Sequence, residues 1–115
     1  MVDSDRAPCR LAVYGTLGPG QPNHHVLSSI EGRWMRGRVR GRLLDAGWGA
    51  ALGYAGLILD ESGNVIEVWV LESTGLMSHW PRLDGFEGPG YRRTTVAVTT
   101  DHGELTAFIY VLGNP

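Results

Sequence analysis

The sequence LDGFEGPGYRR, which spans Leu83–Arg93, marks the boundary between a predicted helix and a predicted strand and carries an acidic residue on an apolar face. Three apolar positions precede Glu87 at helical spacing: Leu83, Trp80 and Leu76. Directly after Glu87, the glycine and proline residues at 88–90 end the helix, and the residues that follow are typical of a strand. Glu87 is therefore expected at a helix end, facing inward beside a turn.

An acidic side chain on a buried face is unusual, because burying a carboxylate costs free energy unless it is hydrogen-bonded, paired or protonated. Such positions are enriched in residues that transfer protons during catalysis. Two interpretations are open at this point: Glu87 acts as an acid or base, or it caps backbone groups or pairs with Arg93. The residues around Glu87 alone favour the second, structural interpretation.

Six short strands are predicted outward from this stretch. They are Arg10–Tyr14, Trp34–Leu44, Leu57–Asp60, Val65–Leu71, Tyr91–Thr100 and Glu104–Leu112. The turn at 61–64 predicts that the third and fourth strands form an antiparallel hairpin. Ser73 or Thr74 can cap the helix that carries Glu87, and a second, short helix can begin at Asn23. This order favours an α+β fold, a small and mostly antiparallel β-barrel with one or two helices.

Length and composition restrict the classes of function. The 115 residues suffice for one compact domain, expected over residues 10–115 behind a frayed tail at 1–9. The net charge of −2 provides no general attraction for nucleic acid or an anionic membrane. The single cysteine, Cys9, excludes an internal disulfide and a thiolate zinc cage, and the histidines lack ligand spacing. We expect a cytoplasmic protein without a metal, nucleic-acid or membrane partner.

One predicted strand carries a row of basic side chains. Its arginines at every second position are Arg36, Arg38, Arg40 and Arg42. A basic strip for phosphates is one interpretation, but four arginines on one strand face are more typical of a solvated or ion-paired surface, which we favour. The glycines between them, Gly37 and Gly41, indicate a bulge or a tightly curved barrel.

A segment rich in glycine and proline follows Tyr14. Gly15 allows the backbone to approach a ligand closely while successive N–H groups point the same way, which suits an anion such as a carboxylate. The segment contains no glycine motif of the phosphate-binding kind. On spacing alone it is interpreted as a plain surface turn.

Two motifs taken together resemble the gamma-glutamylcyclotransferase superfamily, and in particular its AIG2-like branch, which includes gamma-glutamylamine cyclotransferases and the antibiotic-maturation enzyme BtrG. The first motif is YGTL at Tyr14–Leu17, followed by GQPN at 20–23. The second is LDGFEG at Leu83–Gly88, followed by Tyr91 and Arg93. Order and separation agree as well as residue identity, over nearly the whole chain. The resemblance implies a small mixed barrel with α/β character.

The resemblance also implies roles for individual residues. Glu87 is expected to be the catalytic general acid and base, and the loop that begins at Tyr14 is expected to bind the glutamyl group. The candidate substrate-binding residues are Tyr14, Gly15, Thr16, Leu17, Tyr91, Arg93 and Tyr110. For the tyrosines a plain core role is the alternative, and Arg93 can equally brace Glu87 or Asp84.

The implied reaction is the cyclisation of a gamma-glutamyl amide or amine to 5-oxoproline, with release of the free amine and without a metal or cofactor. Correct orientation of the α-amine against the γ-carbonyl of the same molecule can remove about 7–11 kcal/mol of the reaction barrier. The alternative is a non-catalytic module that binds glutamyl compounds on the same fold, suggested by the changed segment at Gly53–Leu57 and the short C-terminus. The sequence leaves the glutamyl acceptor and the oligomeric state open.

Overall fold

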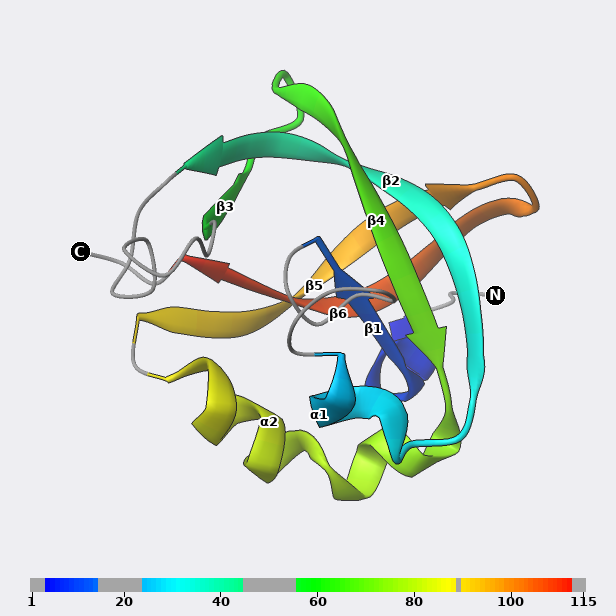
Figure 1. Cartoon of the computed structure of the whole chain (residues 1–115). Coiled ribbons are helices and arrows are strands. Elements are labelled where there is room, and N and C mark those ends of the chain that lie inside the picture. The colour runs from blue at the N-terminus through cyan, green and yellow to red at the C-terminus, as the bar shows by residue number, and fades with distance from the viewer. Residues whose placement is uncertain (1–3, 15–23, 45–55, 89, 113–115) are drawn as a thin grey trace.

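The computed structural model describes residues 4–14, 24–44, 56–88 and 90–112 of the chain, which form a β-barrel with short helices on one side (Figure 1). The strands are β1 (Arg10–Val13), β2 (Arg33–Leu44), β3 (Gly56–Leu59), β4 (Asn64–Glu72), β5 (Tyr91–Thr100) and β6 (Gly103–Leu112). The α-helices are α1 (His25–Ser28) and α2 (Trp80–Glu87), and the 3-10 helices are η1 (Ser4–Cys9) and η3 (Thr74–Ser78). None of the helices in these ranges is long and apolar enough to cross a membrane.

Five strands close the barrel in the order β2, β4, β1, β6 and β5, and β3 lies outside the ring as a further partner of β2. The ring closes where Arg38 of β2 lies opposite Thr99 of β5. Every pairing is antiparallel except that of β1 with β6, which is parallel. The predicted mixed and mostly antiparallel barrel is therefore confirmed.

The predicted hairpin between the third and fourth strands is wrong. Both β3 and β4 pair antiparallel with β2, so they run in the same direction and are not paired with each other. Figure 1 shows the connection at 60–63 passing over β2 between them. The turn itself forms locally, since the Asp60 carboxylate accepts hydrogen bonds from the backbone and hydroxyl of Ser62.

The basic side chains of β2 form an ion-paired and solvated surface, as the favoured interpretation predicted. The Arg36 guanidinium lies 4.9 Å over the Trp69 ring, and Arg40 donates to the Gly63 carbonyl. The other two contact carboxylates: Arg38 that of Asp101 at 4.0 Å, and Arg42 that of Asp60 at 3.8 Å. A Cβ on Gly37, between Arg36 and Arg38, would come within 2.4 Å of a methyl group of Val98, so the close approach of β5 to β2 favours glycine there.

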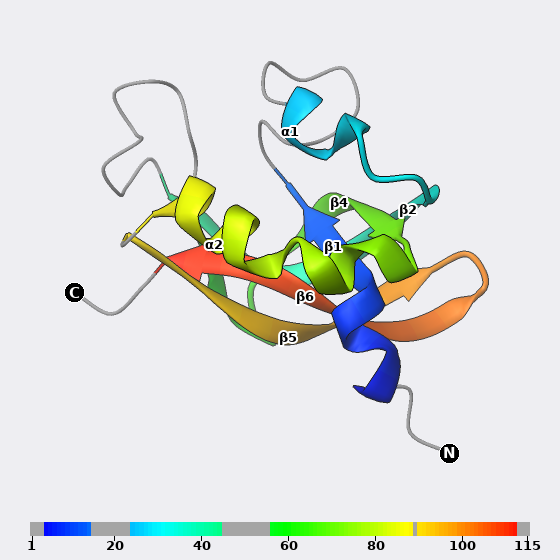
Figure 2. The same cartoon turned by 90° about the horizontal axis from the view of Figure 1, so that it is seen from below.

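Alternate residues of β1, β4 and β6 face two different apolar clusters, as the pleat of a strand requires. The inner cluster contains residues from all six strands: Ala12, Val39, Leu57, Val68, Val70, Val98, Ala107, Ile109 and Val111. The outer cluster, between barrel and helices, contains Leu11, Val13, Leu27, Ile30, Leu71, Leu76, Trp80, Leu83 and Tyr110. Figure 2, seen from below, shows α2 lying across β6. The helices are therefore held by packing against β1 and β6.

The N-terminal segment differs from the frayed tail predicted for residues 1–9, because residues 4–9 form η1. Ala7 is buried, and the indole nitrogen of Trp80 donates to the Pro8 carbonyl at 2.9 Å. The hydrogen bond ties η1 to the start of α2. Burial of Ala7 stabilises this stretch in an ordered conformation, which its polar composition did not indicate.

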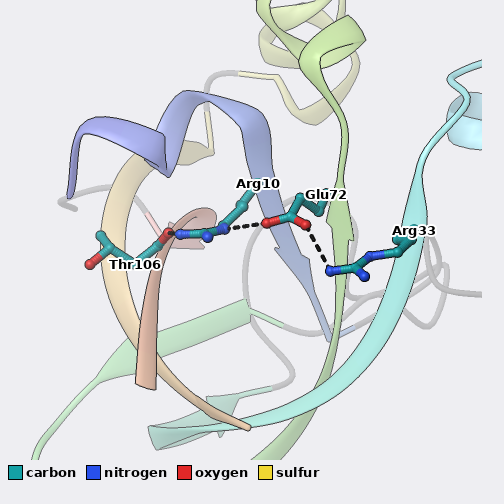
Figure 3. Close-up of polar contacts among 4 residues, drawn as sticks. All are labelled: Arg10, Arg33, Glu72 and Thr106. Carbon is teal, nitrogen blue, oxygen red and sulfur yellow. Dashed lines mark hydrogen bonds and ion pairs between the residues drawn. The ribbon is translucent and has the colours of Figure 1, made fainter. Parts of the chain in front are cut away.

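A partly buried ionic cluster lies where η1 enters β1 (Figure 3). The Arg10 guanidinium contacts the Glu72 carboxylate at 2.9 Å and donates to the Thr106 carbonyl at 3.3 Å. The second carboxylate oxygen of Glu72 accepts from Arg33 at 3.1 Å. Hydrogen bonding from Arg10 lowers the pKa of Glu72. One carboxylate thus joins β1, β2 and β4, and Arg10 extends the contact to β6.

Candidate active site

The helix that carries Glu87 is built in two parts. Ser73 caps η3, since its hydroxyl oxygen accepts from the Gly75 backbone N–H at 3.1 Å, and the same hydroxyl donates to the Glu31 carbonyl. After a break at His79, α2 starts with Pro81 in its first turn, where the missing N–H costs nothing. The apolar positions of the stripe are buried as predicted: Leu76, Trp80 and Leu83.

Glu87 is the last residue of α2 and continues this stripe with a half-buried carboxyl group. Burial raises its pKa from an ordinary value of 4.5 to about 7, because the charged form loses hydration. Within the described ranges it makes neither a hydrogen bond nor an ion pair through its side chain, and Arg93 pairs with Asp84 instead. Glu87 and Arg93 therefore do not form the ion pair that the structural interpretation considered.

Gly88 ends α2 directly after Glu87. Its φ of 81° and ψ of −177° lie in a region that is essentially restricted to glycine, and its N–H donates to the Asp84 carbonyl at 3.1 Å. The helix therefore ends at Glu87, directly before the connection to β5.

Two tyrosines lie near the Glu87 carboxyl group. The pKa values of Tyr14 and Tyr110 are raised well above the ordinary value, first by burial and further by the negative charge of Glu87. Tyr91 also raises the pKa of Tyr14. Glu87 thus lies within electrostatic reach of Tyr14, which follows β1, and of Tyr110 in β6, and Tyr14 in turn lies within reach of Tyr91 at the start of β5.

The tyrosine hydroxyl groups are held by the protein itself. The Tyr14 hydroxyl donates to the Tyr110 carbonyl at 2.7 Å, and a hydrogen bond with the backbone of Leu57 opposes the rise in its pKa. The Tyr110 hydroxyl donates to the Asp84 carboxylate at 2.6 Å. Tyr14 therefore joins β6 to β3 directly before the glycine segment, and Tyr110 joins β6 to α2.

Arg93 is likewise engaged within the protein. Its guanidinium contacts both oxygens of Asp84, with Nε at 3.1 Å and Nη2 at 3.2 Å. The same group lies 4.6 Å over the Trp80 ring and 4.8 Å over the Phe108 ring. Of the two roles considered for Arg93, this geometry corresponds to the bracing of Asp84. Gly15, Thr16 and Leu17, like Asn23, lie outside the described residues.

The sequence did not reveal that Asp84 connects Arg93 to Tyr110, or that Leu57 contacts Tyr14. Asp84 lies one helical turn before Glu87, so its place on the helix was visible, but its partners lie on two strands, Arg93 nine residues and Tyr110 26 residues further along the chain. The signal for Leu57 was weaker still, because it depends on how β3 lies against β6.

The arrangement can transfer a proton near neutral pH. A carboxyl group with a pKa of about 7 is populated both as base and as acid there, as a group that accepts and returns a proton must be. Among the described residues, no group of three or more histidine, cysteine, aspartate or glutamate side chains is placed to hold a metal ion. The raised pKa of Glu87 suits its carboxyl group to accept and return a proton.

Comparison with known proteins gives a consistent family. The family model described as "Gamma-glutamyl cyclotransferase, AIG2-like" matches residues 11–115. YkqA of Bacillus subtilis (strain 168), a supposed gamma-glutamylcyclotransferase, is 35% identical over 102 residues, which are 89% of this chain and 34% of YkqA. The chain thus spans about a third of the length of that curated relative.

Solved structures with the same fold support this family. The crystal structure of Bacillus subtilis YkqA matches with a TM-score of 0.71 and 32% identity, over 91% of this chain and 36% of that one. The crystal structure of an AIG2-like protein from Mus musculus matches with a TM-score of 0.64 and 28% identity, over 91% of this chain and 77% of that one.

Proposed function

Because the chain belongs to the AIG2-like gamma-glutamyl cyclotransferase family, we propose that it cyclises a gamma-glutamyl amide or amine to 5-oxoproline and releases the free amine. The observation that supports this activity most strongly is the state of Glu87. Its carboxyl group is half-buried, its pKa is raised to about 7, and it lies in the electrostatic reach of Tyr14, directly before the glycine segment.

The proposed reaction requires one group that takes a proton and returns it. The α-amine nitrogen of the substrate attacks the γ-carbonyl carbon and forms the new C–N bond of the lactam. The Glu87 carboxylate accepts a proton from this nitrogen and gives it to the leaving nitrogen as the original amide C–N bond breaks. The products are 5-oxoproline and an amine, and Glu87 is again a carboxylate.

The proposal assigns the binding of the glutamyl group to Gly15, Thr16 and Leu17, whose backbone N–H groups are suited to a carboxylate or a developing oxyanion. Tyr14 is assigned to the same site, holding the start of this segment through the Tyr110 carbonyl. Tyr91 and Tyr110 are proposed to line the site beside Glu87. For Arg93 the observed contacts support an indirect role, through Asp84.

The test is the release of 5-oxoproline from a panel of gamma-glutamyl amines, dipeptides and glutamyl-tagged metabolites, followed by mass spectrometry. Glu87→Gln preserves the shape of the side chain and removes its proton-accepting group. We expect it to lower turnover at least about 100-fold, in the range that general acid and base groups supply. Glu104→Gln is the matched control, because Glu104 is exposed in β6 and lies in the hairpin pairing opposite Thr99.

Two outcomes would reject the assignment. A Glu87→Gln variant as active as the Glu104→Gln control would remove Glu87 from the reaction. Absence of product across the whole panel, together with thermal stabilisation of the protein by glutamyl compounds, would support the alternative, a non-catalytic binding module on the same fold.

A further inference from the structure

Asp84 anchors the last turn of α2 to two strands of the barrel. Its Oδ1 accepts from the Tyr110 hydroxyl at 2.6 Å and from Nε of Arg93 at 3.1 Å, and its Oδ2 accepts from Nη2 of Arg93 at 3.2 Å. Arg93 belongs to β5 and Tyr110 to β6, and the two residues lie opposite each other in the sheet. One carboxylate therefore ties α2 to β5 and β6 at a position where these two strands pair.

The partners of Asp84 are themselves fixed. The Arg93 guanidinium lies over the rings of Trp80 and Phe108, at 4.6 and 4.8 Å, and those rings contact each other edge to face at 5.1 Å. Trp80 also donates from its indole nitrogen to the Pro8 carbonyl. A planar guanidinium held on aromatic rings loses little further freedom when it meets a carboxylate. The anchor is thus a rigid one.

Glu87 follows Asp84 by three residues and hence lies about one turn further along α2. A helix end can rotate or fray unless its last turn is held, and Gly88 ends this helix without any further turn. We propose that Asp84 is the positioning residue of the site, and that it keeps Glu87 turned toward Tyr14 and Tyr110 through its contacts with Arg93 and Tyr110. This inference rests on the proposed function only where turnover is measured.

A carboxylate is the group that these contacts require. The fork of Arg93 uses both oxygens, and the hydroxyl of Tyr110 shares one of them. An amide at this position can still accept from Tyr110, but it has one acceptor oxygen in place of two and carries no charge for Arg93. Asp84→Asn is therefore expected to retain part of the anchor, and Asp84→Ala none of it.

The experiment follows Glu87 directly and does not depend on activity. In protein labelled with ¹³C at the glutamate side-chain carboxyl groups, the resonance that disappears in Glu87→Gln belongs to Glu87, and its titration midpoint is measured by NMR. We expect Asp84→Ala to lower this midpoint clearly, because a released helix end exposes Glu87 to water, and Asp84→Asn to give an intermediate value. Tyr110→Phe should lower it as well while leaving the Asp84–Arg93 charge pair intact.

Turnover provides the second measurement. If the last turn is misplaced, kcat per folded molecule should fall about 10- to 100-fold in Asp84→Ala, with KM changed less than about twofold. The matched control is Asp101→Asn, which removes another aspartate–arginine pair, that with Arg38 at 4.0 Å, from an exposed turn. A merely structural role would lower the melting temperature and the folded fraction without changing kcat of the folded protein.

The proposal is overturned if Asp84→Ala matches the Asp101→Asn control in both the Glu87 midpoint and kcat. If the wild-type chain proves inactive on every gamma-glutamyl compound, the proposed function fails, and the midpoints alone then decide whether Asp84 positions Glu87.

Discussion

The carboxyl group of Glu87 makes the stability of the fold depend on pH. In the folded chain its pKa is about 7, whereas the ordinary value, expected in the unfolded chain, is 4.5. Between these values the folded state binds more protons than the unfolded state, so the free energy of unfolding falls as the pH rises. The contribution of Glu87 is fully present below pH 4.5 and is lost as the pH rises through about 7.

Replacing Glu87 with glutamine removes this dependence. The difference in free energy of unfolding, Glu87→Gln minus wild type, should increase by roughly 2–3 kcal/mol as the pH is raised from about 5 to about 8.5. One pKa unit corresponds to about 1.4 kcal/mol. Urea denaturation of both proteins at both pH values measures this difference, and the comparison cancels the titration of other groups. A gap that stays constant with pH would mean that Glu87 titrates as an exposed glutamate does.

At the scale of single residues, the sequence predicted that Glu87 continues an inward-facing stripe, but it did not predict the neighbours of Glu87. Helical spacing is a local property, so the inward stripe from Leu76 through Leu83 could be read without knowing the rest of the fold. The contact between Asp84 and Arg93 depends on the rotamers of two side chains that meet only when β5 packs beside α2. No local pattern distinguishes an arginine that braces Asp84 from one that awaits a substrate.

At the scale of the element, two glycines of the α2 segment should respond to alanine in opposite ways. A Cβ on Gly85 would meet nothing within 4 Å, so Gly85→Ala should stabilise the helix by about 0.5–1 kcal/mol through helix propensity. Gly88 has a φ of 81°, so Gly88→Ala should cost about 1–3 kcal/mol. Chemical denaturation of both variants measures the two signs.

The functional consequence separates these glycines further. Gly88→Ala should also lower turnover, because an alanine strained at this φ would directly follow Glu87. Gly85→Ala should leave turnover unchanged. Equal stability changes at the two positions would contradict the assignment of Gly88 as the helix terminator.

The strands show what local patterns can and cannot determine. The predicted strand at Tyr91–Thr100 coincides with β5, because alternation and β-branched residues are features of the strand itself. The pairing of β3 was predicted wrongly because the turn at 61–64 indicates only a reversal, and the structure instead uses it to pass over β2. Whether two neighbouring strands pair depends on a third, and the twelve residues of β2 provide partners for both.

At the scale of the whole molecule, the barrel depends on contacts between distant parts of the chain. The parallel pairing of β1 with β6 joins Leu11 to Phe108, and no turn signal predicts such a pairing. The family resemblance therefore provided the mixed character of the barrel, which periodicity alone left as mostly antiparallel. The ionic cluster of Arg10, Glu72 and Arg33 stabilises the same junction, because it joins β1 to its neighbours.

This cluster leads to a prediction for the stability of the barrel. The Arg10 side chain is only 8% exposed, so removing its carboxylate partner leaves a buried charge poorly compensated. Glu72→Ala should lower the free energy of unfolding by about 3 kcal/mol. Arg33→Ala is the matched control: it removes the other contact of the same carboxylate, but its side chain is 78% exposed, and less than about 1 kcal/mol should be lost.

The pH dependence provides an independent check on the same pair. The pKa of Glu72 is lowered in the folded chain, so its stabilisation is present above its ordinary pKa and is lost as the pH falls through the lowered value. The difference between wild type and Glu72→Ala, measured by urea denaturation, should therefore shrink in acid, opposite in direction to the effect of Glu87. Equal losses in Glu72→Ala and Arg33→Ala at neutral pH would show that the buried arginine does not need this carboxylate, and that the junction of β1 is held by apolar packing.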